Sequence, residues 1–97
     1  MLYLVSQKGV RSFKIGHTDS LKNRMKAYKT CMGSEPQWIE IIEGTKADET
    51  KWHEDLVNWG FKRISEKSEW FYLPKWLKKE TLLENGFKAL EIYQISL

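Results

Sequence analysis

The chain has 97 residues and a formal net charge of +3, and 13% of its residues are aromatic. This length favours one domain with a modest core. The single cysteine, Cys31, excludes an intrachain disulfide, and no apolar run reaches the roughly 18 residues of a membrane-spanning helix. The first residues lack the layout of a signal peptide, so we expect a soluble cytoplasmic protein.

Charge is distributed unevenly along the chain. Residues 1–34 hold seven bases against one acid, a net of +6, whereas residues 35–97 hold nine bases against twelve acids, a net of −3. Such a split is typical of a protein with one polyanion-binding end, although a charged run is often only a solvated face.

A β-hairpin is predicted at the start of the chain. Residues 2–5 and 12–17 alternate in polarity as strands do, on either side of Lys8 and Gly9. If the turn centres on those two residues, Tyr3 faces Lys14 across the strands, with the two side chains on one face of the sheet.

The later elements follow from periodicity, caps and turn residues. Thr45 and Asp48 resemble a capping box that opens a helix, and Gly60 is expected to stop it. Pro74 suits the first turn of a third helix, which Gly86 would end. The expected elements are a helix at 21–29, a strand at 37–43, a helix at 45–59, a strand at 69–73, a helix at 74–85 and a strand at 88–96.

This order, β-β-α-β-α-β-α-β, predicts an α+β fold in which helices flank a small mixed or antiparallel sheet. We expect a single domain over residues 1–97, with a core at 1–75 and a C-terminal extension of one helix and one strand at 75–97.

Two charged residues border faces that should pack. Arg24 lies one turn from Tyr28 on the first helix, and Glu49 shares a helical face with His53 and Leu56. A buried carboxylate is costly unless it is paired or binds a metal. The structural alternatives are an Arg24–Glu49 ion pair, or a Glu49 that stabilises the helix N-terminus. His53 could be a metal ligand, a general base or a partly buried structural histidine.

Taken in order, these motifs resemble the GIY-YIG nuclease superfamily, and in particular its phage and microbial branch, in which the second triplet reads Lys-Ile-Gly. The resemblance covers about residues 1–75. Met1 stands where the superfamily has its first glycine, Lys14 replaces the second tyrosine, and the late asparagine is not evident. The matching residues are Leu2-Tyr3, Lys14-Ile15-Gly16-His17-Thr18, Arg24, Glu49 with His53, and Glu69-Trp70-Phe71.

The resemblance implies a DNA endonuclease that depends on Mg²⁺ or Mn²⁺. Glu49 matches the metal-binding acid of the family, and His53 is a second candidate ligand. Arg24 matches the arginine that holds the scissile phosphate. Tyr3 would activate or orient the attacking water, Lys14 would act as a base or a phosphate clamp, and the neighbouring His17 would assist.

Further basic residues are candidates for contacts with the DNA backbone. Lys22, Lys26 and Lys29 should face solvent on the first helix, and Arg11 lies in the hairpin. DNA is the expected partner, with a homodimer or a protein partner as a candidate source of specificity. If the chain is phage-encoded, we expect it in the host cytoplasm.

Two other functions stay open at this point. Lys14 in place of tyrosine and the missing asparagine are compatible with a catalytically inactive nucleic-acid-binding module of the same fold. The acidic C-terminal half is compatible with a phage protein-interaction or inhibitor factor.

Overall fold

The computed structural model describes residues 1–31 and 35–95, without the side chains of residues 30–31 and 92–95. The Cys31 thiol and Ser96, the end of the expected last strand, lie outside that part. The elements are β1 (Leu2–Gln7), β2 (Ser12–His17), α1 (Leu21–Cys31), β3 (Pro36–Ile42), α2 (Lys46–Asn58), β4 (Trp70–Tyr72), α3 (Lys79–Asn85) and α4 (Phe87–Ile95).

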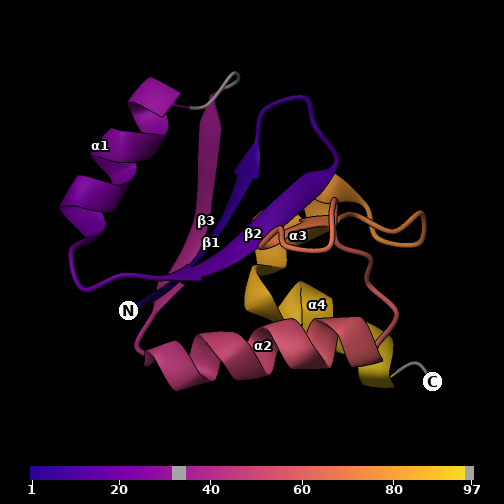
Figure 1. The fold of residues 1–97 in the computed structure, drawn as a ribbon. Helices are drawn as coiled ribbons and strands as arrows, with labels where there is room; N and C mark the ends of the chain where they lie inside the picture. Colours follow the sequence, from indigo (N-terminus) through magenta and orange to yellow (C-terminus); the bar gives the residue numbers. More distant parts are fainter. Residues whose placement is uncertain (32–34, 96–97) are drawn as a thin grey trace.

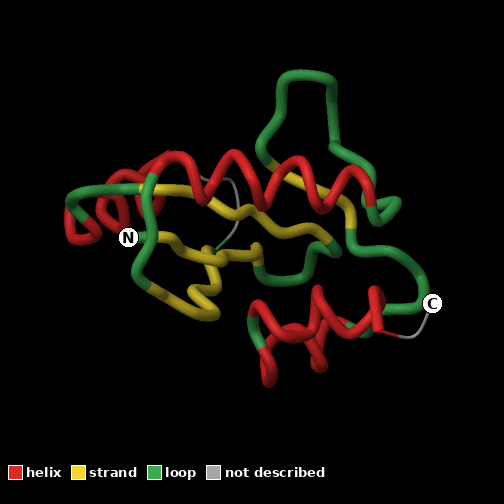
Figure 2. Tube along the Cα trace, turned by 90° about the horizontal axis from the view of Figure 1, so that it is seen from below, coloured by secondary structure: helices red, strands yellow, loops and turns green. Residues whose placement is uncertain are grey.

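The four strands form one antiparallel sheet in the order β3-β1-β2-β4. Figure 1 shows α1 to the left of the strands, α2 below them, and α3 and α4 to the right. The two C-terminal helices lie next to each other in Figure 2. The expected α+β architecture, an antiparallel sheet flanked by helices, is confirmed.

The strand register gives the sheet two distinct faces, because directly paired residues share a face. Leu4 pairs with Ile15 and Phe13 pairs with Phe71, and these side chains form the core face. Helices α2, α3 and α4 pack on the core face through Leu56, Leu82 and Leu90. The opposite face, here called the α1 face, carries Tyr3, Val5, Lys14, Gly16, Trp38, Trp70 and Tyr72.

The predicted hairpin is present, but its predicted register is wrong by two residues. Tyr3 pairs with Gly16, and Lys14 pairs with Val5. The connection is a four-residue loop in which Gly9 has a φ of 76°, whereas a two-residue turn was expected. Because side chains alternate with a period of two, this shift leaves Tyr3 and Lys14 on the same face.

Helix α2 begins and ends where the sequence predicts. The Thr45 side chain accepts a hydrogen bond from the Asp48 backbone N–H, and the Asp48 carboxylate accepts one from the Thr45 N–H at 2.8 Å. Trp59 caps the C-terminus, and the next residue, Gly60, has a φ of 95°. The helix therefore has a fixed starting point, which sets the position of Glu49 in its first turn.

The helix expected from Pro74 begins five residues later, at Lys79. Residues 74–77 form a turn in which the Leu77 N–H donates to the Pro74 carbonyl at 3.1 Å. The Arg11 guanidinium donates to the carbonyls of Pro74 and Leu77 at 2.9 and 2.8 Å. These contacts take up carbonyls that a continuous helix would use internally.

The predicted last strand at 88–96 is wrong, since Phe87–Ile95 forms helix α4. Its buried residues Phe87 and Leu90 follow helical spacing, while Lys88 and Glu91 are exposed. The Glu40 carboxylate of β3 accepts a hydrogen bond from the Phe87 N–H at 2.8 Å and so caps the helix. The alternation in the sequence could not reveal this cap, because it comes from a distant strand.

None of the helices in the described part of the chain combines the length and apolarity needed to cross a bilayer.

Candidate functional site

An aromatic cluster occupies the α1 face beneath helix α1. The hydroxyl groups of Tyr3 and Tyr28 are hydrogen-bonded at 2.8 Å. The Trp38 ring stacks on Tyr28 and tilts against Tyr3, with ring centroids 5.4 and 5.2 Å apart. Tyr3 reaches this position because Gly16 lies opposite it and has no Cβ, since a Cβ there would overlap the Tyr3 ring.

We expect Gly16→Ala to lower the free energy of unfolding by about 1–3 kcal/mol, because the new methyl group forces the Tyr3 ring out of place. Urea denaturation measures the loss. The double variant Tyr3→Leu/Gly16→Ala removes the colliding ring and should recover part of the stability. If the double variant loses as much unfolding free energy as the sum of the losses in Tyr3→Leu and Gly16→Ala, the proposed collision is contradicted.

Burial keeps the phenol of Tyr3 protonated. It raises the pKa of Tyr3 well above its usual value, and the hydrogen bond to Tyr28 adds to the effect. Burial also raises the pKa of Tyr28, although the hydrogen bond with Tyr3 and the charge of Arg24 oppose this shift. One O–H is used within the pair, so the pair is suited to donate one hydrogen bond to a ligand through its other O–H, rather than to remove a proton at neutral pH.

Arg24 projects from α1 toward the tyrosine pair. The positive charge of its guanidinium acts to lower the pKa of both Tyr28 and Tyr3, against the effect of burial. No ion pair joins Arg24 to an acid among the residues described, so the Arg24–Glu49 pair offered as a structural alternative is not found there. A half-buried guanidinium without a carboxylate partner is suited to bind an anion such as phosphate.

Lys14 is the second cationic residue of the cluster, after Arg24. Its ammonium lies 3.0 Å from the Glu69 carboxylate and 5.3 Å from the centre of the Tyr28 ring. Only 11% of the Lys14 side chain is exposed. Burial acts to raise the pKa of Glu69, but the hydrogen bond and charge of Lys14 outweigh it and lower that pKa. Lys14 is thus held by an ion pair beside the tyrosine pair.

Glu49 lies buried in the first turn of α2 and pairs with Lys46 at 2.9 Å. This hydrogen bond raises the pKa of Lys46, and the charges of Glu69 and Lys14 act on it as well. The two ion pairs therefore lie near each other and connect Glu49 to the tyrosine cluster through Lys14. Because 69% of the Lys46 side chain is exposed, this lysine can move into solvent when another cation takes its place beside the buried carboxylate.

The two histidines have different surroundings. His53 is buried against Phe71, and its Nε2 lies 2.7 Å from the Ile15 carbonyl oxygen, which makes that nitrogen a hydrogen-bond donor. The donating Nε2 holds α2 against β2 and cannot itself bind a metal, which leaves Nδ1 as the only ring nitrogen that could act as a ligand. His17 lies 3.7 Å from Asp19 at the end of β2, next to Gly16.

The acids described do not form a complete metal cage. No group of three or more His, Cys, Asp or Glu side chains in the described part of the chain could hold a metal ion together. A lone carboxylate still suits Mg²⁺, which commonly keeps several waters and binds through one or two carboxylates plus substrate phosphates. Glu49 fits that pattern, because it is buried and its lysine partner is exposed.

The predicted DNA-contacting lysines and Arg11 occupy different places. Lys22, Lys26 and Lys29 are exposed on α1, the helix that also carries Arg24. Arg11 is instead tied to the carbonyls of Pro74 and Leu77. Its position favours a structural role in the hairpin loop.

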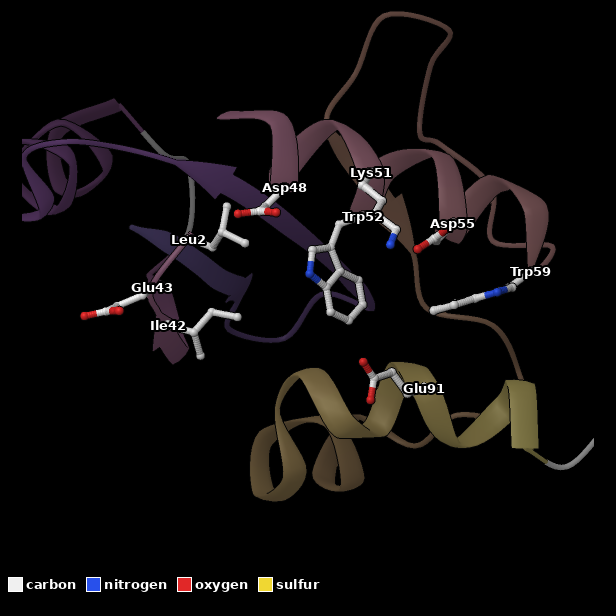
Figure 3. Close-up of a pocket in the computed structure, with 9 residues that line it drawn as sticks. All are labelled: Leu2, Ile42, Glu43, Asp48, Lys51, Trp52, Asp55, Trp59 and Glu91. Carbon is white, nitrogen blue, oxygen red and sulfur yellow. The ribbon is translucent and has the colours of Figure 1, made fainter. Parts of the chain in front are cut away.

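A hollow of about 590 Å³ lies elsewhere, between α2 and α4 (Figure 3). It is lined by Leu2, Ile42, Glu43, Asp48, Lys51, Trp52, Asp55, Trp59 and Glu91. Four carboxylates against one ammonium make this hollow repulsive to a phosphate backbone. The candidate site is therefore the cluster around Arg24, although the Figure 3 hollow is the larger of the two hollows described here.

Four further residues of the cluster were not predicted as site residues: Tyr28, Trp38, Lys46 and Glu69. Tyr28 has helical spacing from Leu21 and Arg24, which indicated packing but not a hydrogen bond to Tyr3. Glu69 belongs to the Glu69-Trp70-Phe71 motif, which was the one available signal for it. No local sequence feature marks the approach of Lys46 to Glu69 and Lys14.

Comparison with models of known protein families assigns the chain to one family. A family model described as the T5orf172 domain matches residues 1–86. The chain belongs to the T5orf172 domain family. The T5orf172 domain is phage-associated and is related to GIY-YIG- and HNH-type nuclease-like folds, which supports a nuclease-like or DNA-binding module. Searches of curated proteins and of solved structures gave no match to this T5orf172 domain.

Proposed function

We propose that this T5orf172 domain is a divalent-metal-dependent DNA endonuclease with a GIY-YIG-type site. The observation that carries the proposal is the cluster of Arg24, the hydrogen-bonded pair Tyr3 and Tyr28, and Lys14 on the α1 face. It combines an arginine that pairs with no acid among the described residues, a hydroxyl donor and a second cation, the groups that a phosphodiester requires.

Each residue has a role that follows from its surroundings. Arg24 holds two phosphate oxygens through its planar guanidinium. Lys14 adds positive charge to the same oxygens when Glu69 yields part of its contact. Tyr3 is fully buried and would hold Tyr28 in place through their hydrogen bond. When Tyr3 donates within the pair, the O–H of the half-buried Tyr28 is free to donate to the phosphate or the attacking water.

Glu49 would hold the metal ion, and Lys46 would move into solvent to free the carboxylate. A bound Mg²⁺ or Mn²⁺ would supply Lewis-acid stabilisation and lower the pKa of a coordinated water. His17, beside Gly16, lies at the end of β2 where it could take part in proton transfer.

Nicking of supercoiled plasmid tests this function. The wild-type protein should convert supercoiled DNA to the open-circular form in Mg²⁺ or Mn²⁺ and should leave it intact in EDTA. Absence of nicking by a folded protein over a range of metals and DNA structures would overturn the enzymatic proposal.

The exposed lysines of α1 should supply salt-dependent affinity. We expect the double variant Lys22→Gln/Lys29→Gln to reduce the slope of log affinity against log salt concentration by about 2, because each phosphate contact contributes about one unit. Fluorescence anisotropy with a labelled duplex measures the slope. The matched control Lys67→Gln/Lys88→Gln changes two exposed lysines on other segments and should keep the wild-type slope. Equal slopes in all three proteins would contradict the assignment.

A nucleic-acid-binding module without turnover is the second candidate. It is favoured by one observation: Glu49 and Glu69 are each already paired with a lysine, at 2.9 and 3.0 Å. Such a module would bind DNA with strong salt dependence in the presence and absence of metal, with no cleavage in either.

A further inference from the structure

Beyond the candidate site, the α1 face continues toward β4 with two aromatic residues. Trp70 pairs with Lys14, and Tyr72 pairs with Ser12, so both aromatic side chains lie on the face that carries Lys14. Phe71, between them, points the other way and is buried in the core. The aromatic pair is therefore directly continuous with the proposed phosphate site.

Helix α1 leaves Tyr72, at the β4 edge of this face, exposed. Its ring contacts run from Tyr28 to Tyr3 of β1 and to Trp38 of β3, on the far side of β2 from β4. Tyr72 is 52% exposed, and Trp70 is half-buried. In Figure 1, α1 lies at the left, well separated from the orange segment that follows α2. A solvent-exposed tyrosine on an open sheet face can accept a flat ligand.

The charge beside Tyr72 is positive. Lys62 and Lys75 are exposed and line a hollow of about 350 Å³ together with Tyr72, Gly60, Leu73 and Pro74, and no acid lines it among the residues described. The Tyr72 N–H donates to the Lys62 carbonyl at 2.9 Å, which fixes the lysine segment along the outer edge of β4. Aromatic side chains next to lysines are the combination that binds single-stranded nucleic acid, through base stacking and backbone neutralisation.

The spacing along β4 also suits bases. Trp70 and Tyr72 are two residues apart, a separation of about 6.8 Å along an antiparallel strand. This is about twice the 3.4 Å rise of stacked bases along one DNA strand. Two rings at this separation can therefore each accept a base from the same strand segment.

We propose that Trp70 and Tyr72 form a stacking platform for unpaired bases of a single-stranded DNA segment that flanks the phosphate held at Arg24 and Lys14. Lys62 and Lys75 neutralise the backbone of that segment. The proposal rests on the proposed function and narrows its substrate class to DNA with an unpaired stretch, such as a flap, bubble or overhang.

The test measures binding without cleavage. Fluorescence anisotropy in EDTA compares a labelled oligothymidylate with a duplex of equal length, for the wild type, Tyr72→Ala and Tyr72→Phe. We expect Tyr72→Ala to weaken single-strand binding about tenfold or more, with duplex affinity within about twofold, and Tyr72→Phe to bind as the wild type does. Val57→Ala, which changes an exposed apolar residue of α2, is the matched control and should have no effect.

The outcomes separate this proposal from the proposed nuclease activity. If Tyr72→Ala binds both DNAs like the wild type, or loses both equally, the platform is overturned even where metal-dependent nicking persists. If nicking is absent but single-strand binding depends on Tyr72, the platform stands and the nuclease assignment fails. If the folded wild type binds neither DNA, the platform is overturned, and a protein partner becomes the better occupant of this face.

Discussion

The Glu49→Gln variant is expected to lose metal-dependent nicking by about 100-fold or more while remaining folded. Glutamine keeps the volume and one oxygen of the buried side chain but lacks the negative charge that would hold the metal. The lost ion pair costs little stability, because Lys46 is largely exposed. Single-turnover plasmid nicking at saturating Mg²⁺ measures the loss.

Glu54→Gln is the matched control, since Glu54 is an exposed glutamate on the same helix. It should nick at the wild-type rate. Circular dichroism must show that Glu49→Gln melts cooperatively. Wild-type nicking by a folded Glu49→Gln protein would remove Glu49 from the site.

The second large effect is expected at Arg24. Arg24→Lys keeps the charge but loses the planar pair of donors, so we expect the rate at saturating DNA to fall by about 100-fold with little change in DNA affinity. The reason is that the fork is proposed to stabilise charge as it develops on the phosphate, whereas general attraction to DNA comes from the exposed lysines of α1.

Steady-state or single-turnover kinetics with a nicked or flapped substrate separate the rate from the affinity. Arg63→Lys serves as the control, because Arg63 contacts the Ser68 carbonyl and the Phe71 ring away from the cluster. A loss of affinity in Arg24→Lys with an unchanged rate would assign Arg24 to DNA binding alone.

The sequence was sufficient to predict the elements whose ends or strands are set by residues close together in the chain. The capping box of Thr45 and Asp48 and the stop at Gly60 set α2 and thereby the position of Glu49. The alternation in residues 2–5 and 12–17 was enough to predict the hairpin. It could not give the register, because a four-residue loop and a two-residue turn have the same flanking pattern.

Two elements were predicted wrongly, α4 as a strand and α3 as a helix that starts at Pro74, because contacts between distant segments determine them. The residues from Phe87 onward have strand-like alternation, yet they form a helix whose first N–H donates to Glu40 of β3. The helix expected at Pro74 is delayed, because Arg11 takes the carbonyls of the intervening turn. Both interactions depend on tertiary proximity that no sequence window contains.

Several of the contacts within the candidate site also join residues that are far apart in the sequence. Arg24 and Glu49 could be identified as candidates because each is a charged residue on or beside the apolar face of its helix. Which group each of them acts on was not predictable: Glu49 pairs with Lys46, and the charge of Arg24 acts on Tyr28. The role of Gly16 also became clear only from the Tyr3 ring that lies over it.

The central claim is that the α1 face around Arg24 holds a DNA phosphate. Amide and arginine side-chain chemical shifts of ¹⁵N-labelled protein, followed while a short DNA is added in EDTA, test it most directly. The account predicts the largest changes at the Arg24 Nε–H and along residues 14–17 and 21–29. Changes centred on the acidic hollow of Figure 3, with Arg24 unaffected, would contradict it.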